Sequence, residues 1–113
     1  MKREIIIAKS VAKAIDGYLK KGKLSQENLD AFYRELAVHP ENGDIIVGTG
    51  GLRKIRLKSS TGGKRGGFRI CYFYFQIKNR IHLLAIYSKN EQEDITNDEK
   101  KILKEYIELL KRG

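Results

Sequence analysis

Residues 68–88 decide the fold, and they read FRICYFYFQIKNRIHLLAIYS. The first part, residues 68–75, is almost entirely aromatic or β-branched, which predicts a strand. Residues 81–88 are apolar at nearly every position, which is typical of a strand buried on both faces inside a sheet. The mainly polar residues 76–80 form a short connection. This stretch therefore predicts two neighbouring antiparallel strands.

A further strand precedes this hairpin, and charged side chains alternate along it. Within residues 52–58, every second residue from 54 onward is a cation, so one face of this strand carries Lys54, Arg56 and Lys58. Residues 59–67 form a glycine-rich loop that leads into the next strand. If helices cover one face of the sheet, the other face presents these cations. We expect Arg69 of the neighbouring strand to lie beside Lys54.

The N-terminal part of the chain predicts one short strand and two helices. Three isoleucines at residues 5–7 indicate the strand, and apolar residues recur at helical spacing over residues 11–19. Gly22 ends this first helix. Ser25 can cap a second helix, which Pro40 ends. The connection between the two helices is short, so they form an antiparallel hairpin.

A last helix follows the strands. Thr96 and Glu99 have the spacing of a capping box, which marks its first turn. We expect its apolar stripe to face the core through Ile102, Leu103, Tyr106, Ile107 and Leu110. The element order is β-α-α-β-β-β-α, and residues 1–113 form a single domain. The expected class is α+β, an antiparallel sheet with the two N-terminal helices on one face and a C-terminal helix.

Positive charge is concentrated in the middle of the chain. Residues 45–90 contain ten lysines and arginines and no aspartate or glutamate, whereas the remainder is close to neutral. The formal charge of +9 is therefore local to one segment. A field concentrated in this way attracts polyanions, and the expected partner is nucleic acid.

Several other classes of protein are disfavoured by the same sequence. The apolar runs are too short to span a bilayer, and the N-terminus lacks the pattern of a signal peptide. The single cysteine, Cys71, cannot form an intramolecular disulfide, which fits a reducing cytoplasm. Its place among aromatic residues favours a small buried hydrophobe over a nucleophile. We expect a cytoplasmic protein that has no membrane partner.

The motifs of common hydrolases and metalloenzymes are missing. We find no His-Glu-x-x-His, Cys-x-x-Cys, phosphate-binding P-loop or Gly-x-Ser-x-Gly sequence, so no metal ion or cofactor is expected. His39 and His82 are far apart in sequence, and each is expected to be structural. RNA can nevertheless be cut without a metal, because the ribose 2′-hydroxyl can attack its own phosphate while cations stabilise the charge. Lys54, flanked by Arg53 and Arg56, is then a candidate general base.

Three segments resemble the RelE/ParE toxin superfamily, most closely its HigB-like branch. They are GGLRKIRL at residues 50–57, GKRGGFRICYFY at 63–74 and YSKNE at 87–91. The resemblance implies the RelE-like fold and a toxin that enters the ribosomal A site and cleaves messenger RNA there. It maps the catalytic residues onto Lys54 as proton acceptor or charge stabiliser, Arg56 as stabiliser of the phosphorane or leaving oxygen, Arg69 as phosphate clamp, and Lys89 closing the site.

Two positions depart from the pattern of the RelE branch, which has an arginine and a tyrosine after its last strand. Asn90 and Thr96 stand there instead, and Lys89 or an aromatic residue such as Tyr72 or Tyr74 could substitute. Further contacts with RNA are expected from residues around the basic strands and the glycine-rich loop. These are Arg53, Lys58, Lys64, Arg65, Gly67 and Tyr72.

The resemblance also implies partners. They are the ribosome, messenger RNA and an antitoxin of the HigA type with a helix-turn-helix DNA-binding domain. The toxin alone is expected to be a monomer, and to form a higher-order complex with its antitoxin. Two other functions stay open. One is inhibition of DNA gyrase, as in ParE-like toxins, and the other is RNA binding without cleavage.

Overall fold

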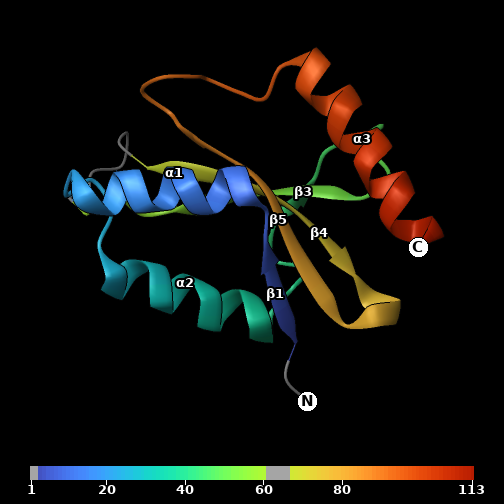
Figure 1. Ribbon diagram of the computed structural model, residues 1–113, viewed down its shortest axis with the longest axis horizontal. Coiled ribbons are helices and arrows are strands. Elements are labelled where there is room, and N and C mark those ends of the chain that lie inside the picture. The colour runs from blue at the N-terminus through green and yellow to red at the C-terminus, as the bar shows by residue number, and fades with distance from the viewer. Residues whose placement is uncertain (1–2, 61–66) are drawn as a thin grey trace.

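The fold is a five-stranded mixed sheet with helices on both faces (Figure 1). The computed structural model of the protein describes residues 3–60 and 67–113. Its elements, in chain order, are β1 (Glu4–Ile7), α1 (Lys9–Lys20), α2 (Gln26–Val38), β2 (Asp44–Ile45), β3 (Leu52–Leu57), β4 (Phe68–Phe75), the 3-10 turn η1 (Gln76–Lys78), β5 (Arg80–Ser88) and α3 (Asn97–Arg112). The predicted α+β class is confirmed.

The order of strands in the sheet is β1-β5-β4-β3-β2. The predicted β4–β5 hairpin and the pairing of β3 with β4 are both antiparallel. The first strand differs from the prediction of an antiparallel sheet, because β1 runs parallel to β5. This pairing sets Ile5 against Ile81 and Ile7 against Leu83, which covers the edge of an apolar strand. The two-residue strand β2 was not predicted, and it pairs with the start of β3.

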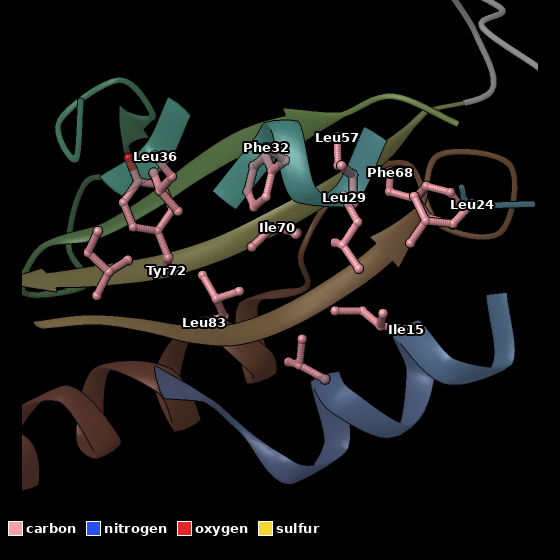
Figure 2. Packing of buried hydrophobic residues seen from close by; sticks show 12 residues of the cluster. Ile15, Leu24, Leu29, Phe32, Leu36, Leu57, Phe68, Ile70, Tyr72 and Leu83 are labelled. Carbon is pink, nitrogen blue, oxygen red and sulfur yellow. The ribbon is translucent and has the colours of Figure 1, made fainter. Parts of the chain in front are cut away.

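Helices α1 and α2 pack against one face of the sheet, which we call the α1/α2 face. Gly22 ends the first helix with a φ of 71°, and the Ser25 side chain caps α2 by accepting a hydrogen bond from Asn28 N at 3.1 Å. Figure 2 shows side chains of α2 pointing toward the strands of this core. The buried residues include Ile15, Leu29, Phe32, Leu36, Leu57, Phe68, Ile70, Tyr72 and Leu83.

Helix α3 packs against the opposite face, which we call the α3 face. It lies apart from α1 and α2 in Figure 1. The predicted capping box is present, with Thr96 and Glu99 bonded reciprocally. The second core, at this face, contains Leu52, Cys71, Phe73, Leu84, Tyr87, Ile95 and Ile107. No helix in the described parts of the chain is both long and apolar enough to cross a membrane.

The inward stripe of α3 is narrower than predicted. Ile107 is buried, and Leu103 and Leu110 are packed beside it. Ile102 and Tyr106 were expected to face the core, but they are 64% and 45% exposed. The helix contacts the sheet along residues spaced four and three apart, and these two side chains lie to one side of that line. The sequence correctly indicated an amphipathic helix but not how much of it the sheet would cover.

Candidate functional site

Four chemically active side chains lie on the α3 face of the three central strands. Alternate residues of a strand share a face, and so do residues paired across strands. The register pairs Arg56 of β3 with Arg69 of β4, and Arg69 with Tyr87 of β5. Lys54, two residues before Arg56, lies on the same face and pairs with Cys71. The prediction that Arg69 lies beside Lys54 is therefore wrong by two residues of the register, because Arg69 pairs with Arg56.

Gly67 allows the two arginines to lie close together. A Cβ atom at this position would lie 3.1 Å from Arg56 Nε, 3.3 Å from Leu57 O and 3.6 Å from Arg69 Nη1. Like charges on directly opposed residues destabilise a strand pair, and an anion bound between the guanidinium groups would relieve that repulsion. The Gly67 carbonyl oxygen also accepts a hydrogen bond from Lys89 N at 3.2 Å. Gly67 thus joins the arginine pair to the segment after β5.

A carboxylate also reaches this cationic face, although the basic segment itself contains none. Asp94, in the segment between β5 and α3, accepts hydrogen bonds at Oδ1 from Lys54 Nζ at 3.2 Å and from the Tyr87 hydroxyl at 3.2 Å. The same oxygen accepts a third bond from Ile95 N at 2.8 Å. The bond from Ile95 N, together with the Lys54 ammonium, lowers the pKa of Asp94 below its ordinary value. Burial first, and then the negative charge of Asp94, raise the pKa of Tyr87.

Neither Asp94 nor Tyr87 was predicted as a site residue. Asp94 lies 40 residues after Lys54, so no local motif connects the two. Tyr87 lies in a strand that is apolar on both faces, and its hydroxyl reaches the site only because it is paired with Arg69. The position of Tyr87 could have been predicted only if the register between β4 and β5 had been known.

The other predicted site residues do not belong to the cluster formed by Lys54, Arg56, Arg69, Tyr87 and Asp94. Lys89 directly follows β5 and is exposed, and its Nζ donates to Glu93 O at 3.2 Å. Lys58 follows the end of β3 and lines a groove beside α2. Lys64 and Arg65 lie outside the described residues.

Two residues predicted to contact RNA, Tyr72 and Arg53, make structural contacts on the α1/α2 face. Tyr72 is 0% exposed on the α1/α2 face, where its hydroxyl donates to Pro40 O and accepts from Gly43 N, both at 2.8 Å. Arg53 is paired with Tyr72, and its Nη1 donates to the carbonyl oxygens of Glu41 and Gly43. Both side chains point away from Lys54 because neighbouring residues of a strand face opposite sides. With no exposed surface, Tyr72 does not fit the predicted role of an RNA contact, whereas an RNA contact by the part-exposed Arg53 stays a prediction.

Tyr74 is also on the α1/α2 face, so it cannot supply the phenol at this site. Its hydroxyl accepts a hydrogen bond from Arg3 Nε at 3.3 Å. Tyr87 is the aromatic residue whose hydroxyl lies against Asp94.

Cysteine and histidine contribute little to this group of side chains. Burial raises the pKa of the Cys71 thiol to about 12, which keeps it protonated and unreactive. His82 is buried in the sheet, and this burial lowers its pKa, whereas His39 is the exposed C-cap of α2. Among residues 3–60 and 67–113, no three His, Cys, Asp or Glu side chains gather in a way that could hold a metal ion.

The arrangement therefore offers phosphate recognition next to a proton acceptor. Arg56 and Arg69 can bind an anion from two strands, and Lys54 adds a third positive charge. Asp94 can accept a proton, and Tyr87 can donate a hydrogen bond. This combination suits stabilisation of a charged phosphorus centre together with proton transfer.

Two comparisons with known proteins bear on this site. A model of the family described as the RelE toxin of the RelE / RelB toxin-antitoxin system matches residues 9–112. The fold is similar to that of a double arginine-to-alanine mutant of the E. coli toxin RelE in its free state, with a TM-score of 0.53. That similarity covers 82% of this chain and 90% of the other, at 15% sequence identity, so it concerns the fold alone.

Proposed function

This chain belongs to the RelE toxin family of toxin–antitoxin systems, and from that premise we propose that it cleaves messenger RNA in the ribosomal A site. The observation that carries the proposal is the strand register, which brings Lys54, Arg56 and Arg69 onto one face of the sheet. Three cations on rigid neighbouring strands suit a single phosphate group whose negative charge grows during reaction.

The cleavage needs only groups that the RNA and this face can supply. The ribose 2′-oxygen attacks the adjacent phosphorus, which leaves a 2′,3′-cyclic phosphate and a 5′-hydroxyl. Arg56 and Arg69 hold the scissile phosphate and stabilise the phosphorane, and Lys54 adds positive charge beside them. DNA lacks the 2′-hydroxyl and would not react in this way.

The ribosome contributes the position of the RNA in this proposal. Single-stranded RNA is flexible, and its 2′-oxygen must line up with the leaving oxygen before attack. Holding the message in the A site removes much of that orientational entropy, so cleavage depends on the ribosome. The concentrated positive charge of the chain supports docking to ribosomal RNA.

An antitoxin partner follows from the family. We include in the proposal that this antitoxin is HigA-like, with a helix-turn-helix domain, and that the free toxin is a monomer. Co-expression with the neighbouring gene, followed by measurement of the mass of the complex by light scattering, tests both statements.

The cleavage proposal is tested by in-vitro translation with purified protein and primer extension along the message. Wild type should produce cuts at A-site codons only when ribosomes are present. Arg69→Ala should abolish them. Arg34→Ala provides a charge-matched control, because Arg34 is an exposed residue of α2, and it should cut like wild type. Intact message with wild type would refute the proposal, and a gyrase supercoiling assay would then test the ParE-like alternative.

A further inference from the structure

Asp94 is the feature of this face that phosphate binding alone does not explain. A carboxylate beside a phosphate site repels the ligand, so a surface built only to bind RNA would exclude it. Residues 45–90 do exclude acidic residues, yet the chain returns after β5 and sets this carboxylate against Lys54. Its presence calls for a role in chemistry rather than in binding.

The fold holds Asp94 in place through several separate contacts. Three donors converge on Oδ1, from Lys54, Tyr87 and Ile95. The next residue, Ile95, is buried in the α3-face core, and the capping box of α3 follows directly. The Gln92 side chain donates to Asp94 O and to Glu99 Oε1, both at 2.8 Å. The segment is therefore tied to β3, β5 and α3.

Glu93 offers an internal comparison. It is also exposed and carries the same charge, one residue earlier. Glu93 contributes its main-chain oxygen, which accepts a hydrogen bond from Lys89 Nζ at 3.2 Å. Asp94 instead directs its carboxylate to Lys54 and Tyr87. Two adjacent acidic residues thus differ in whether the carboxylate lies in the site.

We propose that Asp94 is the general base of the reaction and takes the proton from the attacking ribose 2′-hydroxyl. This inference rests on the proposed function, since it assigns a role within the same site. In the ion pair, Lys54 is the donor and Asp94 the acceptor, so the carboxylate is the group with lone pairs available for a proton. Lys54 then acts as the charge stabiliser, which is one of the two roles that the resemblance left open for it.

The step balances without an added reactant other than water. The O2′–H proton passes to the Asp94 carboxylate as the O2′–P bond forms. The P–O5′ bond breaks, and the leaving 5′-oxygen takes a proton from a water molecule. The Asp94 carboxylic acid then returns its proton to the hydroxide that remains. The products are a 2′,3′-cyclic phosphate and a 5′-hydroxyl end.

Tyr87 is a positioning residue in this scheme. Its hydroxyl donates to the carboxylate, and burial together with the charge of Asp94 raises the pKa of Tyr87. The phenol therefore stays protonated at neutral pH and holds Asp94 in its orientation, whereas it cannot itself accept the 2′-proton.

The groups around Asp94 whose pKa values are shifted keep their charge between pH 6 and 8.5. The pKa of Asp94 is lowered, and so is that of Glu99 at the start of α3, so both carboxylates stay ionised. The pKa of Cys71 is raised to about 12, and that of Tyr87 is raised as well. The charged and titratable groups that face Asp94 are Lys54 from β3, Cys71 from β4, Tyr87 from β5 and Glu99 from α3.

The test is single-turnover cleavage by a preformed complex of toxin with programmed ribosomes, measured by rapid quench from pH 6 to 8.5. Asp94→Asn keeps an acceptor oxygen for its three donors but cannot act as the base. We expect it to lower the rate at pH 7 by about 10²-fold, the lower end of the usual contribution of a general base, because a carboxylate with a lowered pKa is a weaker base. Its rate should then rise about tenfold per pH unit, because hydroxide must remove the proton instead.

Two further variants separate this role from a structural one. Asp94→Glu retains a carboxylate and should keep the pH profile of wild type at a reduced rate. Glu93→Gln removes the same charge outside the site and should cut like wild type. Each variant rate is divided by the wild-type rate at the same pH, which cancels titrations of the ribosome. Melting curves identify any variant that does not fold, and Asp94→Glu then supplies the comparison.

The outcomes are distinguishable. Asp94→Asn within threefold of wild type, or slower with a pH profile parallel to wild type, overturns the assignment and leaves the proposed function intact. No cleavage by wild type overturns the proposed function and this inference with it.

Discussion

The hydroxyl of Tyr72 provides the sharpest test of which aromatic residues serve structure and which serve RNA. It donates to Pro40 O and accepts from Gly43 N, both at 2.8 Å, inside the α1/α2-face core. The change Tyr72→Phe removes one oxygen atom and keeps the ring. Two buried main-chain groups, one carbonyl and one amide, would lose this partner.

The expected loss of stability follows from those two bonds. A net hydrogen bond contributes about 0.5–1.5 kcal/mol, and a buried polar group left unsatisfied costs about 1–3 kcal/mol. We therefore expect Tyr72→Phe to lower the free energy of unfolding by about 2 kcal/mol. For a domain of this size, roughly 4 °C of melting temperature corresponds to 1 kcal/mol, so the Tm should fall by about 8 °C.

Urea titration and thermal melting measure this loss, and RNA cleavage is compared well below the melting temperature. Tyr106→Phe is the matched control, because Tyr106 is a half-exposed tyrosine of α3, and its stability should change by less than about 0.5 kcal/mol. Cleavage by Tyr72→Phe should equal that of wild type. An unchanged Tm together with slower cleavage would refute the reasoning and return Tyr72 to the RNA contacts.

Three other changes test neighbouring parts of the structure. Gly67→Ala places a Cβ 3.1 Å from Arg56 Nε and should slow cleavage about tenfold or more. In the control Gly17→Ala, the new Cβ meets nothing within 4 Å, so this variant should stabilise α1 by about 0.5–1 kcal/mol and leave cleavage unchanged. Equal cleavage by both variants would show that the approach of Arg56 to Gly67 is unimportant. The pKa of the Cys71 thiol rises from 9.0 to about 12 on folding, so between these pH values only the unfolded chain ionises at this residue. The free energy of unfolding should therefore fall as the pH rises above 9, by at most about 1.4 kcal/mol per pH unit. Cys71→Ala should make this fall less steep in urea titrations, and an unaltered slope would contradict the burial argument. Thr96→Ala removes the cap of α3 and should cost about 0.5–2 kcal/mol in the same titrations, with no loss if the capping box contributes nothing.

Local chemistry made most of the elements predictable from the sequence. Ser25 and the Thr96–Glu99 pair mark helix starts through bonds to residues three positions away, so both signals are contained in a few residues. The alternation in β3 likewise placed Lys54 and Arg56 on one face. These features could be predicted because each depends only on residues that are close together in the sequence, within one helical turn or one strand.

The remaining features depend on contacts between distant segments. Nothing local determines that β1 runs parallel to β5, or that Arg69 lies opposite Arg56 rather than beside Lys54. Tyr72 was assigned to RNA because an aromatic in a basic region fits either role, and only its parity relative to Leu57 and Phe68 places it in the core. Asp94 was missed because it reaches Lys54 across 40 residues of chain.

The parallel pairing of β1 has a consequence for how a new copy of the protein matures. Glu4 lies beside Arg80, 76 residues further along, so β1 cannot pair until β5, the last of the five strands, has been made. Contacts at such separation slow folding, and chains emerge from the ribosome N-terminus first. Asp94 and α3 arrive later still. The face that carries Lys54, Arg56, Arg69 and Asp94 therefore cannot assemble until β5 and the segment after it have been synthesised, so a ribosome that is still making β1 to β4 carries no complete site.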